Sequence, residues 1–225
     1  MYRSIWEELL VKDIHSLRIE TKQLGEIFKK NYSTNVTLNK FPITLEGVLL
    51  GEIETDAEPS RAIELTHHLA VNLRGVQSLE QLHAFTDLLN WVEEARKIAP
   101  EVVDWIGLYF KASWLLREET TDLVLGPYLG EVTNHVRIPI DRGMCGLALR
   151  EEKIVNVEDV TKESSHIACS LKTRSELVLP LTDELGNYIA ELDIDSNVLN
   201  AFSKEVENKY RLFIESFPSV LKTFR

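Results

Sequence analysis

Hydrophobic positions in the first quarter of the chain predict a helix followed by a short extended segment. From Ile5 to Phe28 they recur at roughly the 3.6-residue period of a helix, which predicts a helix over residues 1–31. Residues 44–54 read as a short extended segment, with apolar residues clustered around two glycines. The acidic, turn-rich segment TDAEPS (residues 55–60) follows and marks a domain boundary. We therefore predict an N-terminal helical extension, residues 1–58, made of the helix and the extended segment.

Two further helices are predicted after this boundary. Residues 60–74 have helical spacing, and Gly75 ends the segment. Ser78 and Gln81 then form a capping box, in which a serine and a glutamine three residues later satisfy backbone N–H groups at a helix start. This second helix extends to about residue 98.

From residue 102 the hydrophobic spacing becomes that of strands. The candidate strands are residues 103–110, 123–129, 136–140, 176–181 and 188–194. Residues 183–187 (DELGN) predict a hairpin turn, and residues 143–150 a short helix. Residues 203–224 close the chain as a helix that Pro218 breaks or kinks. This order predicts an α+β fold, an antiparallel sheet with helices packed on one face, as one domain over residues 59–225.

The charge of the chain limits its partners. A formal net charge of −11 leaves no basic surface for nucleic acid, and anionic membranes are disfavoured for the same reason. No apolar run approaches the ~20 residues that span a bilayer. Glu7 and Glu8 stand where a signal peptide would be apolar. We therefore expect a cytoplasmic protein with no nucleic-acid or membrane partner.

Three acids form the first group of candidate site residues. Asp193 and Asp195 are two residues apart in a predicted strand, so both side chains leave the same face. Adjacent carboxylates repel each other unless a cation or a shared proton intervenes. Glu176 begins the preceding strand and can meet the aspartates across the pair. The acids predict a socket for an ammonium group or a protonated substrate oxygen; the alternative is the exposed polar face of an edge strand.

The two cysteines of the chain form the second group. Two are too few for the disulfide framework of a small secreted protein. Cys169 stands close to Lys172 and Arg174, whose positive charge favours a thiolate. Cys145 falls in the first turn of the predicted short helix, where backbone N–H groups favour a thiolate as well. Catalytic thiols and buried core cysteines are both compatible with the sequence.

Two aromatic residues and two histidines complete the candidate site residues. Trp105 and Tyr109 are four residues apart in a predicted strand and share a face, either as core or as a wall for an apolar or thioether group. The sequence also supplies a Cys2His2 set of candidate zinc ligands, namely His135, Cys145, His166 and Cys169. Structural zinc sites bring two close pairs, and this set has only one. We therefore predict no metal and no cofactor.

Six motifs in the second half of the chain resemble those of one enzyme family. They are LGPYLG (125–130), VRIP (136–139), RGMCG (142–146), HIAC (166–169), SELVLPL (175–181) and LDIDS (192–196). They occur in the order, and near the spacing, of the GAF-domain free methionine-(R)-sulfoxide reductases, enzymes that reduce the free amino acid rather than protein-bound sulfoxide. From about residue 60 onward the chain resembles this family, which implies a GAF fold and reduction of free methionine sulfoxide.

The resemblance also implies a role for each candidate residue. Cys169 matches the nucleophile, which attacks the sulfoxide sulfur and becomes a sulfenic acid. Cys145 matches a resolving thiol, whose disulfide a thioredoxin-like reductant reopens. The three acids match residues that hold the ammonium group and the sulfoxide oxygen. The two aromatic residues of the strand match those around the methyl-sulfur end.

Two features depart from the family pattern. Before VRIP the family commonly has a third cysteine, and this chain has His135, so the disulfide between that position and the nucleophile cannot form. Either Cys145 is the sole resolving thiol, or the redox cycle is lost and the domain is a non-catalytic GAF sensor that binds a small molecule. The extension before residue 59 is the second departure. Its helix resembles a dimerisation or docking element, and we predict a homodimer.

Overall fold

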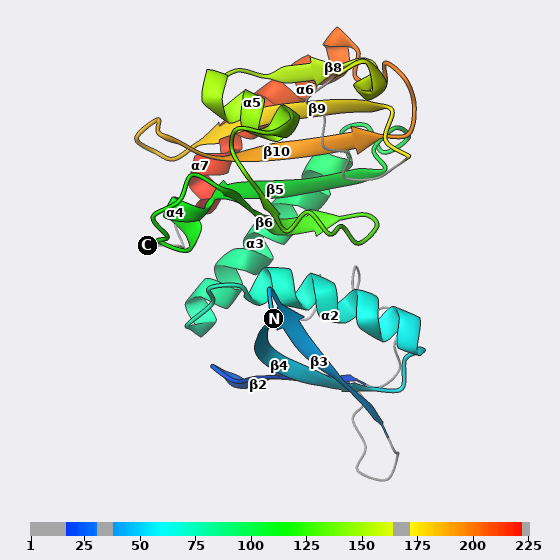
Figure 1. The fold of residues 1–225 in the computed structure, drawn as a ribbon, viewed down its shortest axis with the longest axis vertical. Coiled ribbons are helices and arrows are strands. Elements are labelled where there is room, and N and C mark those ends of the chain that lie inside the picture. The colour runs from blue at the N-terminus through cyan, green and yellow to red at the C-terminus, as the bar shows by residue number, and fades with distance from the viewer. Residues whose placement is uncertain (1–16, 31–37, 164–171, 222–225) are drawn as a thin grey trace. The chain divides into compact units, whose positions relative to one another are not determined.

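The computed structural model describes residues 17–30, 38–163 and 172–221 (Figure 1). Two compact units divide between Thr86 and Asp87. Each is built on an antiparallel sheet, with four strands in the first unit and six in the second. The boundary expected between residues 58 and 59 stays a prediction.

The sheet of the first unit has the strand order β2-β1-β4-β3. Its strands are β1 (Leu17–Thr21), β2 (Gly25–Lys30), β3 (Asn39–Leu45) and β4 (Val48–Thr55). The helix predicted over residues 1–31 is therefore wrong for residues 17–30. Leu17, Ile19 and Thr21 are buried in the two-residue alternation of a strand, and the helical spacing had passed over Ile19. Residues 1–16 lie outside the described part of the chain.

One helix completes the core of the first unit. α2 (Pro59–Leu73) packs on β3 and β4 and buries Leu65 and Leu69. Proline suits its first turn, because the N–H that proline lacks has no partner at a helix start. The segment TDAEPS thus connects β4 to α2 within one unit.

The second unit contains a six-stranded sheet in the order β7-β6-β5-β10-β9-β8. Its strands are β5 (Trp105–Lys111), β6 (Leu123–Leu129), β7 (Arg137–Ile138), β8 (Val155–Val157), β9 (Ser175–Thr182) and β10 (Tyr188–Ser196). All neighbouring pairs are antiparallel, as predicted. The three-residue strand β8 was not predicted. β10 lies between β5 and β9, so it is an inner strand.

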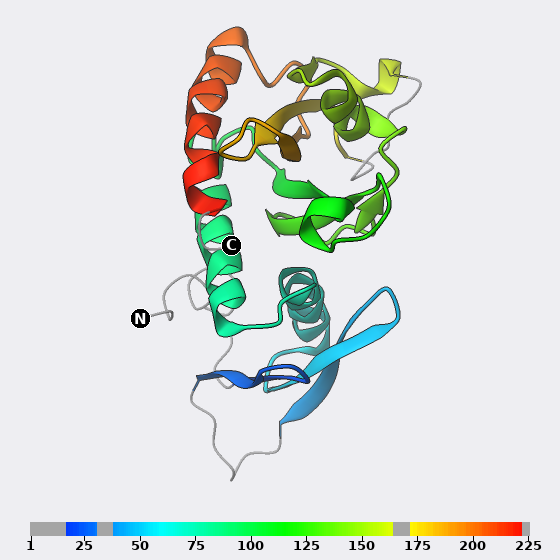
Figure 2. The same cartoon turned by 90° about the vertical axis from the view of Figure 1, so that its left-hand side faces the viewer.

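The helices of the second unit lie on both faces of its sheet. They are α3 (Leu79–Arg96, which begins in the first unit), α4 (Ala112–Leu115), α5 (Gly143–Glu151), α6 (Lys204–Phe213) and α7 (Phe217–Val220), with 3-10 turns η2 (Val160–Lys162) and η3 (Ile214–Ser216). Figure 2 shows α6 and α7 on one side of the sheet and α5 on the other. On the α7 side, Phe217 packs against Trp91 and Phe110, with ring centroids 5.2 and 6.4 Å away. α5 contacts β9 and β10, a position that the sequence did not predict.

Several local predictions are confirmed. The Ser78 hydroxyl accepts the Gln81 N–H at 3.2 Å at the start of α3, and Gly186 adopts φ = 82° in the β9–β10 hairpin. The closing helix is divided ahead of Pro218 into α6, η3 and α7. Among the described residues, no helix is both long and apolar enough to cross a bilayer.

Candidate active site

Three predicted acids meet on one face of the six-stranded sheet. Asp193 and Asp195 project from β10, and the register places Asp195 opposite Glu176 of β9 and Trp105 of β5. Asp193 is fully buried, and Asp195 and Glu176 are 2% and 3% exposed. The alternative of an exposed edge strand is wrong, because β10 is paired on both sides. Buried carboxyl groups therefore line the face of the six-stranded sheet that α5 covers, opposite the face covered by α6 and α7.

Aromatic rings border these acids. Trp105 and Tyr109 share the acid face of β5, with ring centroids 6.3 Å apart. Trp105 also stacks on Tyr128 of β6 at 5.5 Å. Gly107 leaves room for these two rings. A Cβ at this position would lie 2.5 Å from the Trp105 ring and 2.6 Å from the Tyr128 Cβ, so any larger residue would collide with both. The glycine thus lets the indole lie flat across the strand.

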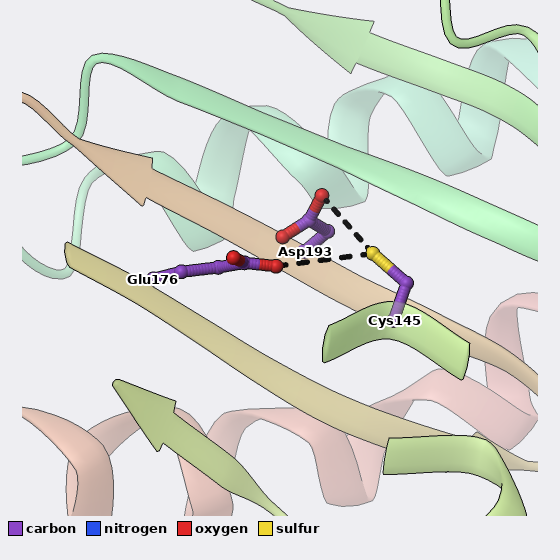
Figure 3. A group of neighbouring side chains, drawn as sticks. All are labelled: Cys145, Glu176 and Asp193. Carbon is purple, nitrogen blue, oxygen red and sulfur yellow. Dashed lines mark hydrogen bonds between the residues drawn. The ribbon is translucent and has the colours of Figure 1, made fainter. Parts of the chain in front are cut away.

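Cys145 points from α5 toward the same acids (Figure 3). The residue lies in the first turn of the helix, as predicted, and is 4% exposed. Its Sγ donates to an Asp193 oxygen at 3.6 Å and to a Glu176 oxygen at 3.9 Å. Gly146 allows this approach, because a Cβ there would collide with the carbonyl oxygen of Ile140.

Sequence reasoning missed one acid of the site. Glu191 lies on the same face of β10, opposite Tyr109, and is fully buried. Neither of its carboxylate oxygens accepts a hydrogen bond from a nitrogen or oxygen donor of the described residues. The signal was the alternation of ELDIDS, in which Glu191, Asp193 and Asp195 are successive members of one strand face.

Burial and mutual repulsion raise the pKa of two carboxyl groups in this cluster. Burial, and then the negative charge of Asp193, hold the pKa of Glu191 well above its usual range; the Cys145 thiol partly offsets this by hydrogen bonding, and Glu176 adds to it. The pKa of Asp195 is also well above its usual range, through burial and then the charges of Asp193 and Glu176. A raised pKa favours the protonated form of a carboxyl group, which can donate its proton.

A cavity of about 280 Å³ opens beside the acids. It is lined by Asp104, Trp105, Glu131, Val132, Lys172, Thr173, Asp195 and Asn197. Asp195 and Trp105 thus face an accessible space, whereas Cys145 lies deeper among the carboxyl groups. The Lys172 ammonium at the rim pairs with Glu131 at 2.6 Å. This pairing offsets part of the positive charge that was expected to act on Cys169.

The remaining predicted residues are His135, His166 and Cys169. Cys169 and His166 are outside the described residues. His135 is half-buried, and its backbone carbonyl accepts a hydrogen bond from the Tyr109 hydroxyl at 2.8 Å. Of the four candidate zinc ligands, the structure therefore describes only His135 and Cys145.

The comparisons with known proteins give related enzymes. No protein-family model matches the chain. The free methionine-R-sulfoxide reductase of Escherichia coli is 40% identical over 121 residues, 54% of this chain and 68% of that protein. The structure of the type II free methionine-R-sulfoxide reductase of Thermoplasma acidophilum is 31% identical, with a TM-score of 0.56, and covers 64% of this chain and 95% of its own. The structure of the Neisseria meningitidis reductase in complex with its substrate is 26% identical, with a TM-score of 0.55 and coverages of 75% and 93%.

Proposed function

Because the chain belongs to the GAF-domain free methionine-R-sulfoxide reductase family and is an oxidoreductase of that type, we propose that it reduces free methionine-R-sulfoxide to methionine. Cys169 acts as the nucleophile, Cys145 as the resolving thiol, and a thioredoxin-like protein as the reductant. The reductase of Neisseria meningitidis, whose structure was determined with its substrate, supports a small amino acid as the ligand.

The observation that carries this proposal is the buried acid face bordered by aromatic rings. Glu176 and Asp193 provide carboxylates that attract the ammonium group of a free amino acid, which a residue inside a protein chain lacks. Trp105 and Tyr109 provide ring surfaces on which a thioether or sulfoxide sulfur packs well. One face of the sheet thus offers groups for both ends of methionine sulfoxide.

The first chemical step needs a nucleophile and a proton donor. The Cys169 thiolate attacks the sulfoxide sulfur while Asp195, which faces the cavity and whose raised pKa favours the protonated form, protonates the sulfoxide oxygen. The sulfur–oxygen bond of the substrate breaks, and the released hydroxide attacks the Cys169 sulfur. The bond between the two sulfurs then breaks, so methionine leaves and Cys169 becomes a sulfenic acid. Lys172, three residues after Cys169 in the sequence, lines the same cavity.

The second step regenerates the thiols. The sulfur of Cys145 attacks the sulfenic sulfur of Cys169. A neighbouring carboxylate such as Asp193 relays the thiol proton to the sulfenic hydroxyl group, which leaves as water. A dithiol protein then reduces the disulfide. With His135 in place of the family's third cysteine, this route needs no other cysteine of the chain.

Two further predictions about partners accompany the proposal. The homodimer expected from the sequence loses its helical basis, since residues 17–30 are strands, but it stays a prediction that light scattering tests. The role of residues 1–58 as a dimerisation or docking element is tested in the same experiment by deleting the first unit, residues 1–86, as a whole.

The test of the proposed function is a coupled assay. Free methionine-R-sulfoxide is supplied with thioredoxin, thioredoxin reductase and NADPH, and NADPH oxidation is followed; the S epimer and a peptide-bound sulfoxide serve as controls. We expect turnover of the free R epimer alone, only background in Cys169→Ser, and a stoichiometric burst of methionine without turnover in Cys145→Ser. Peptide mapping after substrate treatment is expected to give a Cys145–Cys169 disulfide.

The non-catalytic sensor gives a different result. In that case the wild-type protein shows no turnover above Cys169→Ser, while calorimetry still detects binding of methionine or its sulfoxide. The acid face also argues against cyclic nucleotides as the ligand of such a sensor, because carboxylates repel phosphate.

A further inference from the structure

One sulfur and two carboxylate oxygens, each from a different helix or strand, lie close together on the acid face of the sheet. The Sγ of Cys145 and one carboxylate oxygen each of Glu176 and Asp193 all lie within 4.8 Å of one another (Figure 3). All three residues are buried and come from α5, β9 and β10. The sequence did not predict this group, because its zinc candidates were cysteines and histidines.

The spacing of these atoms matches a tetrahedral metal ion. Zinc bonds of ~2.3 Å to sulfur and ~2.1 Å to a carboxylate oxygen, at a tetrahedral angle, place the two ligand atoms ~3.6 Å apart. The sulfur of Cys145 lies 3.6 Å from the Asp193 oxygen and 3.9 Å from the Glu176 oxygen. All three atoms lie within 4.8 Å of one another, so one ion can bind them once the side chains close around it.

Glu191 is a second, independent observation at this place. It is fully buried, and its two oxygens accept no hydrogen bond from a nitrogen or oxygen donor of the described residues. It stands two residues before Asp193 on the same face of β10, and the Cys145 thiol hydrogen-bonds to its carboxyl group. A buried carboxylate is costly unless a proton or a cation neutralises it.

We propose that Cys145, Glu176, Asp193 and Glu191 form a binding site for a divalent cation of the zinc class. One sulfur and carboxylate oxygens are ligands that Zn²⁺ accepts in four-coordinate sites, whereas Mg²⁺ and Ca²⁺ require oxygen alone. Binding replaces the proton of the Cys145 thiol by the metal, and the proton leaves to solvent. The metal thereby neutralises carboxylates that would otherwise repel one another.

The site implies competition with the proposed reaction. A bound cation takes the carboxylates of Glu176 and Asp193 that would hold the substrate ammonium group, and it occupies the thiol that would resolve the sulfenic acid. Zinc then acts as an inhibitor that a chelator reverses. This consequence rests on the proposed function, whereas the metal site itself does not.

The experiment measures metal binding without substrate. Reduced, metal-free full-length protein is titrated with Zn²⁺ in competition with a chromogenic chelator, and separately with Co²⁺, whose bond to a thiolate gives a charge-transfer absorption in the near ultraviolet. We expect one metal ion per chain, release of a proton on binding, and the cobalt–thiolate absorption. Failure of the reductase assay would leave this result unchanged, so the two proposals are tested separately.

Variants assign the ligands. Cys145→Ser is expected to abolish the cobalt–thiolate absorption, and the matched variant Cys169→Ser to keep it. Glu191→Gln, which preserves the shape of the side chain, should weaken Zn²⁺ binding about ten-fold or more. Circular dichroism establishes that each variant is folded. Absence of binding, absorption that persists in Cys145→Ser, loss of absorption in Cys169→Ser, or unchanged affinity in Glu191→Gln would each overturn the proposal.

Discussion

The hydroxyl of Tyr109 donates a hydrogen bond of 2.8 Å to the backbone carbonyl of His135. Tyr109 is fully buried in β5, whereas His135 lies in the connection between β6 and β7. The bond therefore fastens to the sheet the residue that stands where the resembling family commonly has its third cysteine. It also fixes the ring that borders Glu191 across the β5–β10 pair.

Replacing Tyr109 with phenylalanine removes this bond and leaves the carbonyl of the half-buried His135 without this donor. We expect the free energy of unfolding of the second unit to fall by about 1–2 kcal/mol, because the ring itself stays packed. The connection near His135 should become more mobile, so the KM for methionine sulfoxide should rise more than kcat falls. Urea unfolding and steady-state kinetics measure the two effects. Unchanged stability would mean that the bond contributes nothing.

Introducing a cysteine at residue 135 tests the recycling route. If Cys145 is the sole resolving thiol, Cys145→Ser stops after one methionine per active site, and adding His135→Cys should restore thioredoxin-dependent turnover. His135→Ser on the same Cys145→Ser background is the control, since it changes the side chain without adding a thiol. Turnover in that control would show that residue 135 acts otherwise than through a thiol.

Much of the site follows from local patterns in the sequence. The two-residue period of a strand placed Asp193 beside Asp195, and the glycine-rich start of a helix placed Cys145 in a first turn; both features are observed. Each depends only on neighbours along the chain. The approach of Cys145 to Asp193, 48 residues away, depends on how α5 packs on the sheet, and no local pattern encodes it.

The two wrong or missing predictions, the helix over residues 17–30 and the unrecognised Glu191, also result from contacts between residues far apart in the sequence. Leu17, Leu24, Ile27 and Phe28 fit a helical period and a pair of short strands equally well, and pairing with β4 decides between them. Glu191 was passed over because a single glutamate in a strand is usually solvated. Its burial results from the central position of β10, which only the pairing with β5 and β9 establishes.

Gly107 provides a test of the aromatic wall. In Gly107→Ala the new Cβ meets the Trp105 ring at 2.5 Å and the Tyr128 Cβ at 2.6 Å, so the indole must move. We expect a loss of about 1–3 kcal/mol in stability, as for other overpacked positions, together with a raised KM for methionine sulfoxide.

The matched control for this variant is Gly186→Ala in the β9–β10 hairpin. Gly186 has no atom within 4 Å of an added Cβ, but its φ of 82° strains an alanine by about 1 kcal/mol. This control should therefore lose stability and keep its KM. Equal KM values in the two variants would contradict the role of the wall in substrate binding.

The protonation of Glu191 makes a prediction about the pH dependence of stability. Its pKa is raised in the folded protein by burial and then by the charge of Asp193. In the unfolded chain a glutamate loses its proton near pH ~4.3, so above this pH unfolding releases a proton. The stability contributed by protonated Glu191 is therefore present below the unfolded pKa and is lost as pH rises toward the folded one.

Glu191→Gln removes this dependence, because glutamine does not ionise. Relative to wild type, the variant should gain stability as the pH is raised from the unfolded pKa of ~4.3 toward the folded pKa of Glu191, by up to about 1.4 kcal/mol per pH unit within that window. Urea unfolding followed by tryptophan fluorescence suits this test, since Trp91, Trp105 and Trp114 all lie in the second unit. A chelator is included so that metal binding does not contribute. A stability difference that is constant with pH would mean that Glu191 ionises in the folded protein as it does in the unfolded chain.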